Sequence, residues 1–171
     1  MKETVEVYVA RILGYVAGRE PTKVIEQTPL RLRELVRAAT PEVTDFRPAP
    51  GKWTVREQVA HLADTEMVMT TRMRWAAAQP GQPIVAFDQE KWAEAGKYAL
   101  IPIELSLDTF TAVRIWTVDF LQRLTDGERA GYVQHEERGR ETLVRLVTMM
   151  AGHDLNHLRQ ISELMTSAAQ K

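Results

Sequence analysis

Two histidines, His153 and His157, stand four residues apart near the C-terminal end of the sequence. In an α-helix, residues at this spacing share one face, one turn apart, so both imidazoles can reach the same point. Four apolar residues recur on that face, which are Leu146, Met150, Ile161 and Leu164. An apolar stripe marks the side of a helix that meets the core. Because neutral imidazole is the most common metal ligand in proteins, the pair indicates a buried metal site.

The competing interpretation is that both histidines are ordinary core residues with satisfied hydrogen bonds. His153 is followed by Asp154, so the pair is not the H-E-x-x-H motif of zinc proteases, whose general base is missing. Spacing alone leaves metal binding and a structural role equally open. Two histidines hold a catalytic metal poorly, so a third ligand must come from another helix. The remaining histidines of the sequence are His61 and His135.

His61 lies on a predicted helix that begins at Thr54, beside the acidic residues Glu57 and Asp64. Periodicity does not decide whether this mixed face lines a cavity or lies at the surface. For Glu57 we favour a capping box with Thr54. Asp64 is either a solvated acid or the acceptor that fixes the tautomer of His61. His135 follows in a polar segment, where we expect it to be exposed.

Four amphipathic segments are predicted to position these residues. Their expected ranges are 5–16 together with 28–39, then 54–78, 106–126 and 141–167. The first helix is expected to be broken, because Gly18 and Pro21 end one piece and Thr28 with Pro29 is a typical start for the next. We find no strand-like alternation in the sequence. The pattern therefore predicts an all-α four-helix bundle.

The connection between the second and third helices, residues 79–103, has no long periodic pattern. So long a connection within a compact domain is uncommon and is usually a lid or a binding loop. We expect it to contain a short helix capped by Asp88. It also permits a crossover, so that the helices on either side could run parallel. A second connection, 128–140, is expected to be a polar link.

Composition narrows the classes of protein. A chain of 171 residues fits a single domain over residues 1–171. A net charge of −1 without a basic cluster argues against nucleic-acid and membrane-surface partners. The sequence contains no cysteine, which excludes a protein thiolate nucleophile and any cysteine-ligated metal. No stretch approaches the ~18 apolar residues of a membrane helix. We expect a cytoplasmic protein.

Three stretches of the sequence resemble the DinB-like superfamily of metal-binding helical bundles. They are Gly51–Asp64, then Phe87 and Asp88 together with Trp92, and finally His153–His157. The final H-x-x-x-H alone is not specific, whereas the combination is. The resemblance covers most of the chain, from about residue 12 to residue 164.

The resemblance implies a bundle with an up-down-down-up order of helices, which agrees with the long connection before the third helix. It also implies a divalent metal, zinc or nickel before iron, held by three histidines that map onto His61, His153 and His157. Relatives often form homodimers. The sequence itself does not identify the metal, because imidazole suits several of them.

Some members of this superfamily are transferases that use low-molecular-weight thiols such as bacillithiol or mycothiol. Our first hypothesis is therefore a metal-dependent transferase acting on a small thiol, whose pKa the metal would lower. Because the chain has no cysteine, the nucleophile must be this cosubstrate or water. A metal-dependent hydrolase would use the same ligands. The non-enzymatic alternatives are a stress-associated metal-binding dimer and a plain scaffold without metal.

Overall fold

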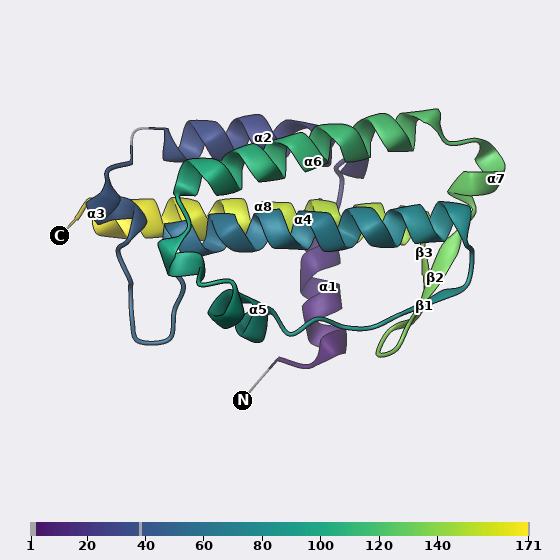
Figure 1. The fold of residues 1–171 in the computed structure, drawn as a ribbon, viewed down its shortest axis with the longest axis horizontal. Helices are drawn as coiled ribbons and strands as arrows, with labels where there is room; N and C mark the ends of the chain where they lie inside the picture. The colour runs from purple at the N-terminus through teal and green to yellow at the C-terminus, as the bar shows by residue number, and fades with distance from the viewer. Residues whose placement is uncertain (1–2, 38, 171) are drawn as a thin grey trace.

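The four longest helices of the computed structural model, which describes residues 3–37 and 39–170, lie side by side as a bundle (Figure 1). They are α2 (Pro21–Val36), α4 (Val55–Ala78), α6 (Ile103–Arg123) and α8 (Leu143–Ala168). Followed by colour, α4 and α6 run in one direction, and α2 and α8 run in the other (Figure 1). This is the up-down-down-up order, so the predicted fold class is confirmed. No helix in the described part of the chain is long and apolar enough to cross a membrane.

The first predicted helix is indeed two helices, but the second begins earlier than expected. Helix α1 (Val5–Val16) ends before Gly18, whose φ of 73° suits glycine, and α2 already starts at Pro21. Thr28 is therefore not an N-cap. It lies buried inside α2, where its hydroxyl donates to the Val24 carbonyl at 2.9 Å. Helix α1 crosses α8 instead of continuing along α2 (Figure 1).

Pro29 lies inside α2, a position that normally disrupts a helix because the ring removes one N–H donor. The carbonyl left without a helical partner is that of Ile25, four residues earlier. In this structure the Ile25 carbonyl accepts a hydrogen bond from Arg114 of α6 at 2.7 Å. A tertiary contact thus replaces the missing helical bond, which explains why the start signal at Thr28 and Pro29 was misleading.

The N-termini of the other three bundle helices show which of the predicted capping residues are correct. The capping box of Thr54 and Glu57 opens α4 as predicted. Helix α6 begins one turn earlier than expected, after Pro102, and Ser106 lies buried within it. Helix α8 begins after Thr142, whose side chain accepts a hydrogen bond from the Arg145 N–H. Proline before the first helical turn is compatible with a start, since that turn needs no internal donor.

Both connections contain short strands, so the expected absence of strands is wrong. Strand β1 (Gln82–Ile84) pairs in parallel with β2 (Tyr132–His135), which pairs antiparallel with β3 (Gly139–Thr142). Strands of three or four residues are too short for an alternating pattern to stand out. The short helix α7 (Asp126–Arg129) precedes β2.

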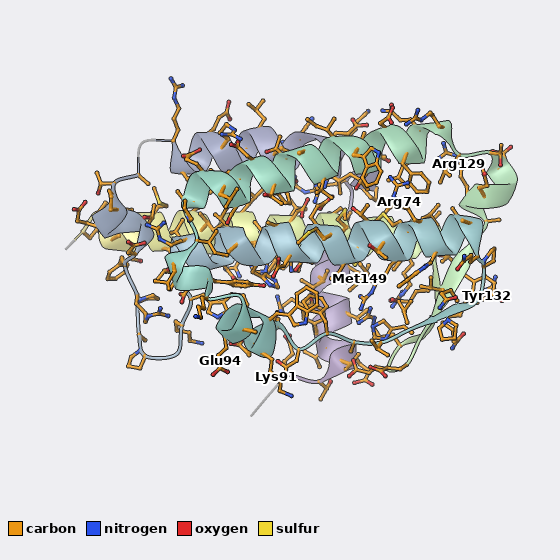
Figure 2. The ribbon with its side chains drawn as sticks, in the orientation of Figure 1. Arg74, Lys91, Glu94, Arg129, Tyr132 and Met149 are labelled. Atoms are coloured by element: carbon orange, nitrogen blue, oxygen red, sulfur yellow. The ribbon has the colours of Figure 1, made fainter. Side chains whose placement is uncertain are left out.

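The rest of the crossover lies on the outside of the bundle. Asp88 caps α5 (Gln89–Ala95) as predicted, and a 3₁₀ turn, η1 (Tyr98–Leu100), follows. No residue of α5 is buried, and Lys91 and Glu94 point away from the bundle (Figure 2). Between α2 and α4 lies the short helix α3 (Pro41–Thr44).

The bundle core consists of two apolar clusters with a polar layer between them. One cluster, near the strands, contains Ile25, Met73 and Leu146, and the other contains Leu32, Val59 and Ile161. On each bundle helix, buried polar residues lie between the two clusters. They are Thr28 of α2, Glu66 of α4, Arg114 of α6, and Asp154 and His157 of α8. This layer contains the predicted site.

Candidate metal centre

The three histidines that the resemblance grouped do lie together. His61 comes from α4, and His153 and His157 come from α8; one ring nitrogen from each lies within 4.8 Å of the others. The Nε2 atoms of His61 and His153 are 3.1 Å apart. His61 and His157 are buried and His153 is half-buried. The i, i+4 spacing therefore directs both rings of α8 to one point, as predicted.

Burial keeps these imidazoles neutral. It lowers the pKa of His61 to about 4. Loss of hydration, followed by the neighbouring histidines, lowers the pKa of His153 and His157 well below the ordinary value. A proton added to any of the three would meet two other rings in a site of low dielectric. Neutral imidazole is the form that binds a metal.

Gln58 orients one of the rings. Its Oε1 lies 3.0 Å from Nδ1 of His157, and Gln58 is buried on α4 one turn before His61. An amide oxygen can only accept, so Nδ1 of His157 carries the proton and Nε2 keeps its lone pair for the cluster. Sequence reasoning missed Gln58. Its i, i+3 spacing from His61 was the one available signal.

The two acids near His61 have other partners. Glu57 completes the capping box, as we favoured, and also accepts from Arg47 at 2.8 Å. Asp64 accepts a hydrogen bond from the hydroxyl of Tyr98 at 2.5 Å. Of the two roles left open for Asp64, that of acceptor to His61 is thus not what the structure shows. The neighbours of His61 are instead the Thr65 hydroxyl, at 3.5 Å from Nδ1, and the ring of Trp53.

A fully buried ion-pair network lies beside the histidines. Arg114 donates to both carboxylate oxygens of Glu66, at 2.9 and 2.6 Å, and to both of Asp154, at 2.7 and 3.1 Å. Burial raises the pKa of Glu66, and the adjacent guanidinium opposes that rise. Asp154 follows His153 directly, so this network fixes the turn of α8 that carries the histidine pair.

His135 is not part of the cluster, and the expectation that it is exposed is wrong. It lies on β2 with 1% of its surface exposed, and its Nδ1 accepts from the Glu137 N–H at 3.2 Å. Burial lowers its pKa to about 4. Strand β2 packs against α4 as well as pairing with β1 and β3, so this residue lies inside the fold. The local sequence, which is polar on both sides, gave no sign of this.

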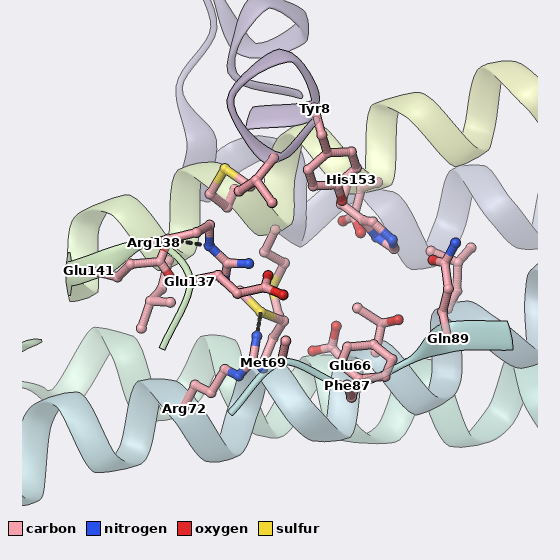
Figure 3. A pocket seen from close by; sticks show the side chains of 18 of the residues that line it. Tyr8, Glu66, Met69, Arg72, Phe87, Gln89, Glu137, Arg138, Glu141 and His153 are labelled. Atoms are coloured by element: carbon pink, nitrogen blue, oxygen red, sulfur yellow. Dashed lines mark hydrogen bonds and ion pairs between the residues drawn. The ribbon is translucent and has the colours of Figure 1, made fainter. Parts of the chain in front are cut away.

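Two cavities meet at His153. The smaller one, about 300 Å³, extends toward the β2–β3 hairpin, and Phe87 of the crossover lines it (Figure 3). The larger one, about 700 Å³, extends past His157 toward Lys52 and Trp53. Residues that line both are Glu3, Tyr8, Gln89 and His153. The crossover thus contributes Phe87 and Gln89 to the cavity walls, and the contribution of the N-terminal segment was not foreseen.

An up-down-down-up bundle with three converging imidazoles defines a helical protein built to bind a metal. Residues 25–161 match the sequence profile of the DinB superfamily, and the chain belongs to this superfamily. One relative, a protein of Oceanobacillus iheyensis named as a candidate metal-dependent hydrolase, is 31% identical over 82% of this chain and 81% of its own length. A similarly named protein of Geobacillus kaustophilus is 28% identical over 82% of this chain and 79% of its own.

A solved structure shares the fold. YfiT from Bacillus subtilis, described as a candidate metal-dependent hydrolase with an unusual four-helix bundle topology, superposes with a TM-score of 0.79. The match covers 99% of this chain and 91% of YfiT, at 23% sequence identity. The common architecture therefore extends over almost the whole described chain, including α1 and the strands.

Proposed function

We propose that this protein is a metal-dependent transferase that acts on a low-molecular-weight thiol and a second small molecule. Its metal ligands would be His61, His153 and His157. The observation that carries the proposal is that His153 of this cluster lines both cavities and His157 lines the larger one. Two separate cavities suit a reaction between two organic molecules better than the attack of water on one.

The donor set fits a divalent cation. Nε2 of His61 and Nε2 of His153, at 3.1 Å, can share only one proton, and neither ring has a carboxylate partner within the described chain. Imidazole nitrogens gathered within 4.8 Å of one another are unfavourable in a buried site unless a proton or a cation lies between them. Zinc and nickel both accept such a set. A cation held by three imidazoles keeps a position open for an exchangeable ligand and activates a thiol or water as a Lewis acid.

The chain's own residues supply binding and orientation. Because the sequence contains no cysteine, the thiol must come from a small molecule. The larger, more open cavity beside His157 is suited to that cosubstrate, and the smaller one beside Phe87 to the acceptor of the transfer. Gln58 and the Arg114 network hold the rings in place while both molecules bind.

Hydrolysis is the second candidate, and the names of the curated relatives favour it. The same ligands would serve, with water as the nucleophile and a single organic substrate. A stress-associated dimer that binds the metal without catalysis would retain the ligands and lack both reactions.

Elemental analysis of the purified protein tests the ligand assignment. We expect a stoichiometric divalent metal in the wild type and a loss of most of it in His153→Ala and His157→Ala. His135→Ala is the matched control, since this histidine is buried but lies outside the cluster. Unchanged metal content in both α8 variants would refute the site.

Cobalt-substituted protein then separates the reactions. Addition of a small thiol, with 2-mercaptoethanol as the probe, should change the visible absorption spectrum if sulfur reaches the cation. An unchanged spectrum would contradict the transferase. Turnover of simple esters or amides by such a protein would then favour hydrolysis, and no turnover would favour the non-catalytic dimer.

A further inference from the structure

Arg72 is a buried cation without an acidic partner. It lies on α4 with 5% of its surface exposed. Its Nη2 donates to the Val85 carbonyl at 2.7 Å, and its Nη1 lies 4.0 Å from the sulfur of Met69. Within the described chain no carboxylate forms an ion pair with it. The ring of Phe87, whose centroid lies 5.9 Å from Cζ of Arg72, is a third contact, so the partners of the guanidinium in the described chain are all neutral.

Such an arrangement is unfavourable unless something compensates for it. Removing a charge from water is unfavourable, and buried charges are normally paired. Arg114, on the neighbouring helix α6, is a buried arginine that is paired with two carboxylates. Burial and the neighbouring Arg138 lower the pKa of Arg72 to about 10, which leaves the guanidinium charged at neutral pH.

The charge of Arg72 faces the smaller cavity. Figure 3 shows Arg72 and Arg138 on one side of this cavity and His153 and Gln89 on the other. Four of the acids that line it already have arginine partners, and these are Glu3, Glu66, Glu141 and Asp154. Glu137, on the exposed hairpin, is the remaining acid. The cavity therefore offers the buried cation of Arg72 and one competing carboxylate on an exposed residue, that of Glu137.

Between the two ends, the wall is largely apolar. Its members are Leu62, Met69, Phe87, Leu146, Met149 and Met150. At about 30 Å³ per water molecule, a volume of 300 Å³ corresponds to on the order of ten non-hydrogen atoms. A molecule that fills this space would place a small apolar body against the methionines, one end at Arg72 and the other at His153.

We propose that Arg72 binds the carboxylate of a small, apolar-bodied substrate whose opposite end reaches the histidine cluster. A planar guanidinium matches a carboxylate through two parallel N–H···O bonds. The carboxylate would belong to a substrate of the proposed transferase, so its part in a reaction rests on that proposed function. Binding of the anion itself requires only Arg72 and the cavity.

The test compares benzoate with benzamide, which has nearly the same shape and no charge. Ligand-observed NMR on the purified protein should show benzoate binding about tenfold or more tightly than benzamide, since one hydrogen-bonded charge pair is worth at least that factor. Arg72→Met should reduce the preference to within about twofold, and Arg72→Lys should retain part of it. Equal affinity of benzoate and benzamide for the wild type, or no binding of either, would overturn the proposal.

Two controls locate the carboxylate. Arg74→Met removes a cation two residues away that stacks on Trp116 and Phe120, and it should leave benzoate binding unchanged. His153→Ala should lose metal yet keep the preference for benzoate. Loss of benzoate binding in His153→Ala with none in Arg72→Met would mean that the carboxylate binds the metal, which would refute the proposal. Tighter binding of inorganic phosphate than of benzoate through Arg72 would refute the carboxylate assignment in the same way.

Discussion

At the scale of single residues, the histidine cluster depends on which ring nitrogen carries a proton. Gln58 settles this for His157, because its amide oxygen accepts from Nδ1. The residue is neutral, so it orients the ring without adding a charge to the site. A partner that fixes a ligand's tautomer commonly contributes 10- to 100-fold to metal affinity.

Gln58→Leu should therefore weaken metal binding by about 10- to 100-fold while the fold is kept. The acceptor is lost and the His157 ring is free to turn away from the cluster. Competition with a chromophoric chelator measures the change. Gln58→Glu is the matched variant, since it keeps an acceptor at the same position. Equal affinity in wild type and Gln58→Leu would show that the hydrogen bond has no such role.

The lowered pKa values of the buried histidines predict how the stability of the metal-free protein, prepared with a chelator, depends on pH. An unfolded histidine takes up a proton near pH 6.5, whereas His61 resists it down to about pH 4. Stability is therefore full above pH 6.5 and falls as the pH drops toward 4, by about 3 kcal/mol for His61 alone. His135, His153 and His157 act in the same direction. Urea unfolding at pH 7.5 and pH 5.0 measures this, and equal stability at both values would contradict it.

The sequence predicted the histidines of the site but few of their neighbours. The pair on α8 follows from helical spacing, and His61 followed from the resemblance alone. Gln58, Glu66 and Arg114 were missed, because the partner of a polar side chain depends on how two helices are aligned lengthwise. That alignment leaves no trace in the periodicity of either helix. The exposure expected for His135 is wrong for a similar reason, since β2 packs against α4 and pairs with β1, and both elements are far away in sequence.

At the scale of elements, the crossing of α1 over α8 brings two backbones into contact. A Cβ placed on Gly152 would lie 2.2 Å from the Ile12 carbonyl oxygen, so only glycine fits there. Glu3 precedes α1 and Tyr8 lies within it, and each of these two residues lines both cavities. The close approach at Gly152 thus sets the position of one wall of the site.

Gly152→Ala should displace α1, lower the midpoint of thermal unfolding and loosen both cavities, because the obstructing atom belongs to the backbone. Gly14→Ala is the control within α1 itself. A Cβ there meets nothing within 4 Å, and alanine should stabilise the helix by about 0.5–1 kcal/mol. Thermal unfolding of both variants compares the two effects. A stabilised Gly152→Ala protein would mean that the crossing is not tight.

The bundle helices were predictable from apolar periodicity and capping, whereas the placement of the remaining elements was not. Helix α1 has the same pattern as a bundle helix, and nothing in it specifies a crossing over α8. The strands are three or four residues long. Strands β2 and β3 form a local hairpin, whereas β1 joins them only because residues about 50 positions apart meet. Thr28 and Pro29 were misread because their local preference is overridden by a hydrogen bond from Arg114.

At the scale of the whole molecule, Arg114 connects all four bundle helices. It lies on α6 and binds the Ile25 carbonyl of α2, Glu66 of α4 and Asp154 of α8. These hydrogen bonds centre the polar layer, which lies between the two apolar clusters, on one guanidinium. They fix the lengthwise alignment of the helices, which apolar contacts alone specify weakly.

Arg114→Met should destabilise the protein by about 3–5 kcal/mol, since two buried carboxylates would lose their cation. Arg33→Met is the matched control, because Arg33 pairs with Asp108 at the surface and such pairs contribute about 0–1 kcal/mol. Chemical denaturation of both variants measures the difference. Similar stabilities of the two would show that the buried network does not hold the bundle together.

The parallel course of α4 and α6 has a consequence for how the chain folds. Thr70 bonds Thr117 across 47 positions of sequence, and Glu66 bonds Arg114 across 48. In an up-and-down bundle, neighbouring helices can form their contacts one after another, starting at the short turn that joins them. Here every contact between α4 and α6 closes a loop of nearly the same number of residues. The full entropy cost of closing that loop is therefore incurred before the first contact forms. This interface therefore assembles late and more slowly than that of an up-and-down bundle of equal length.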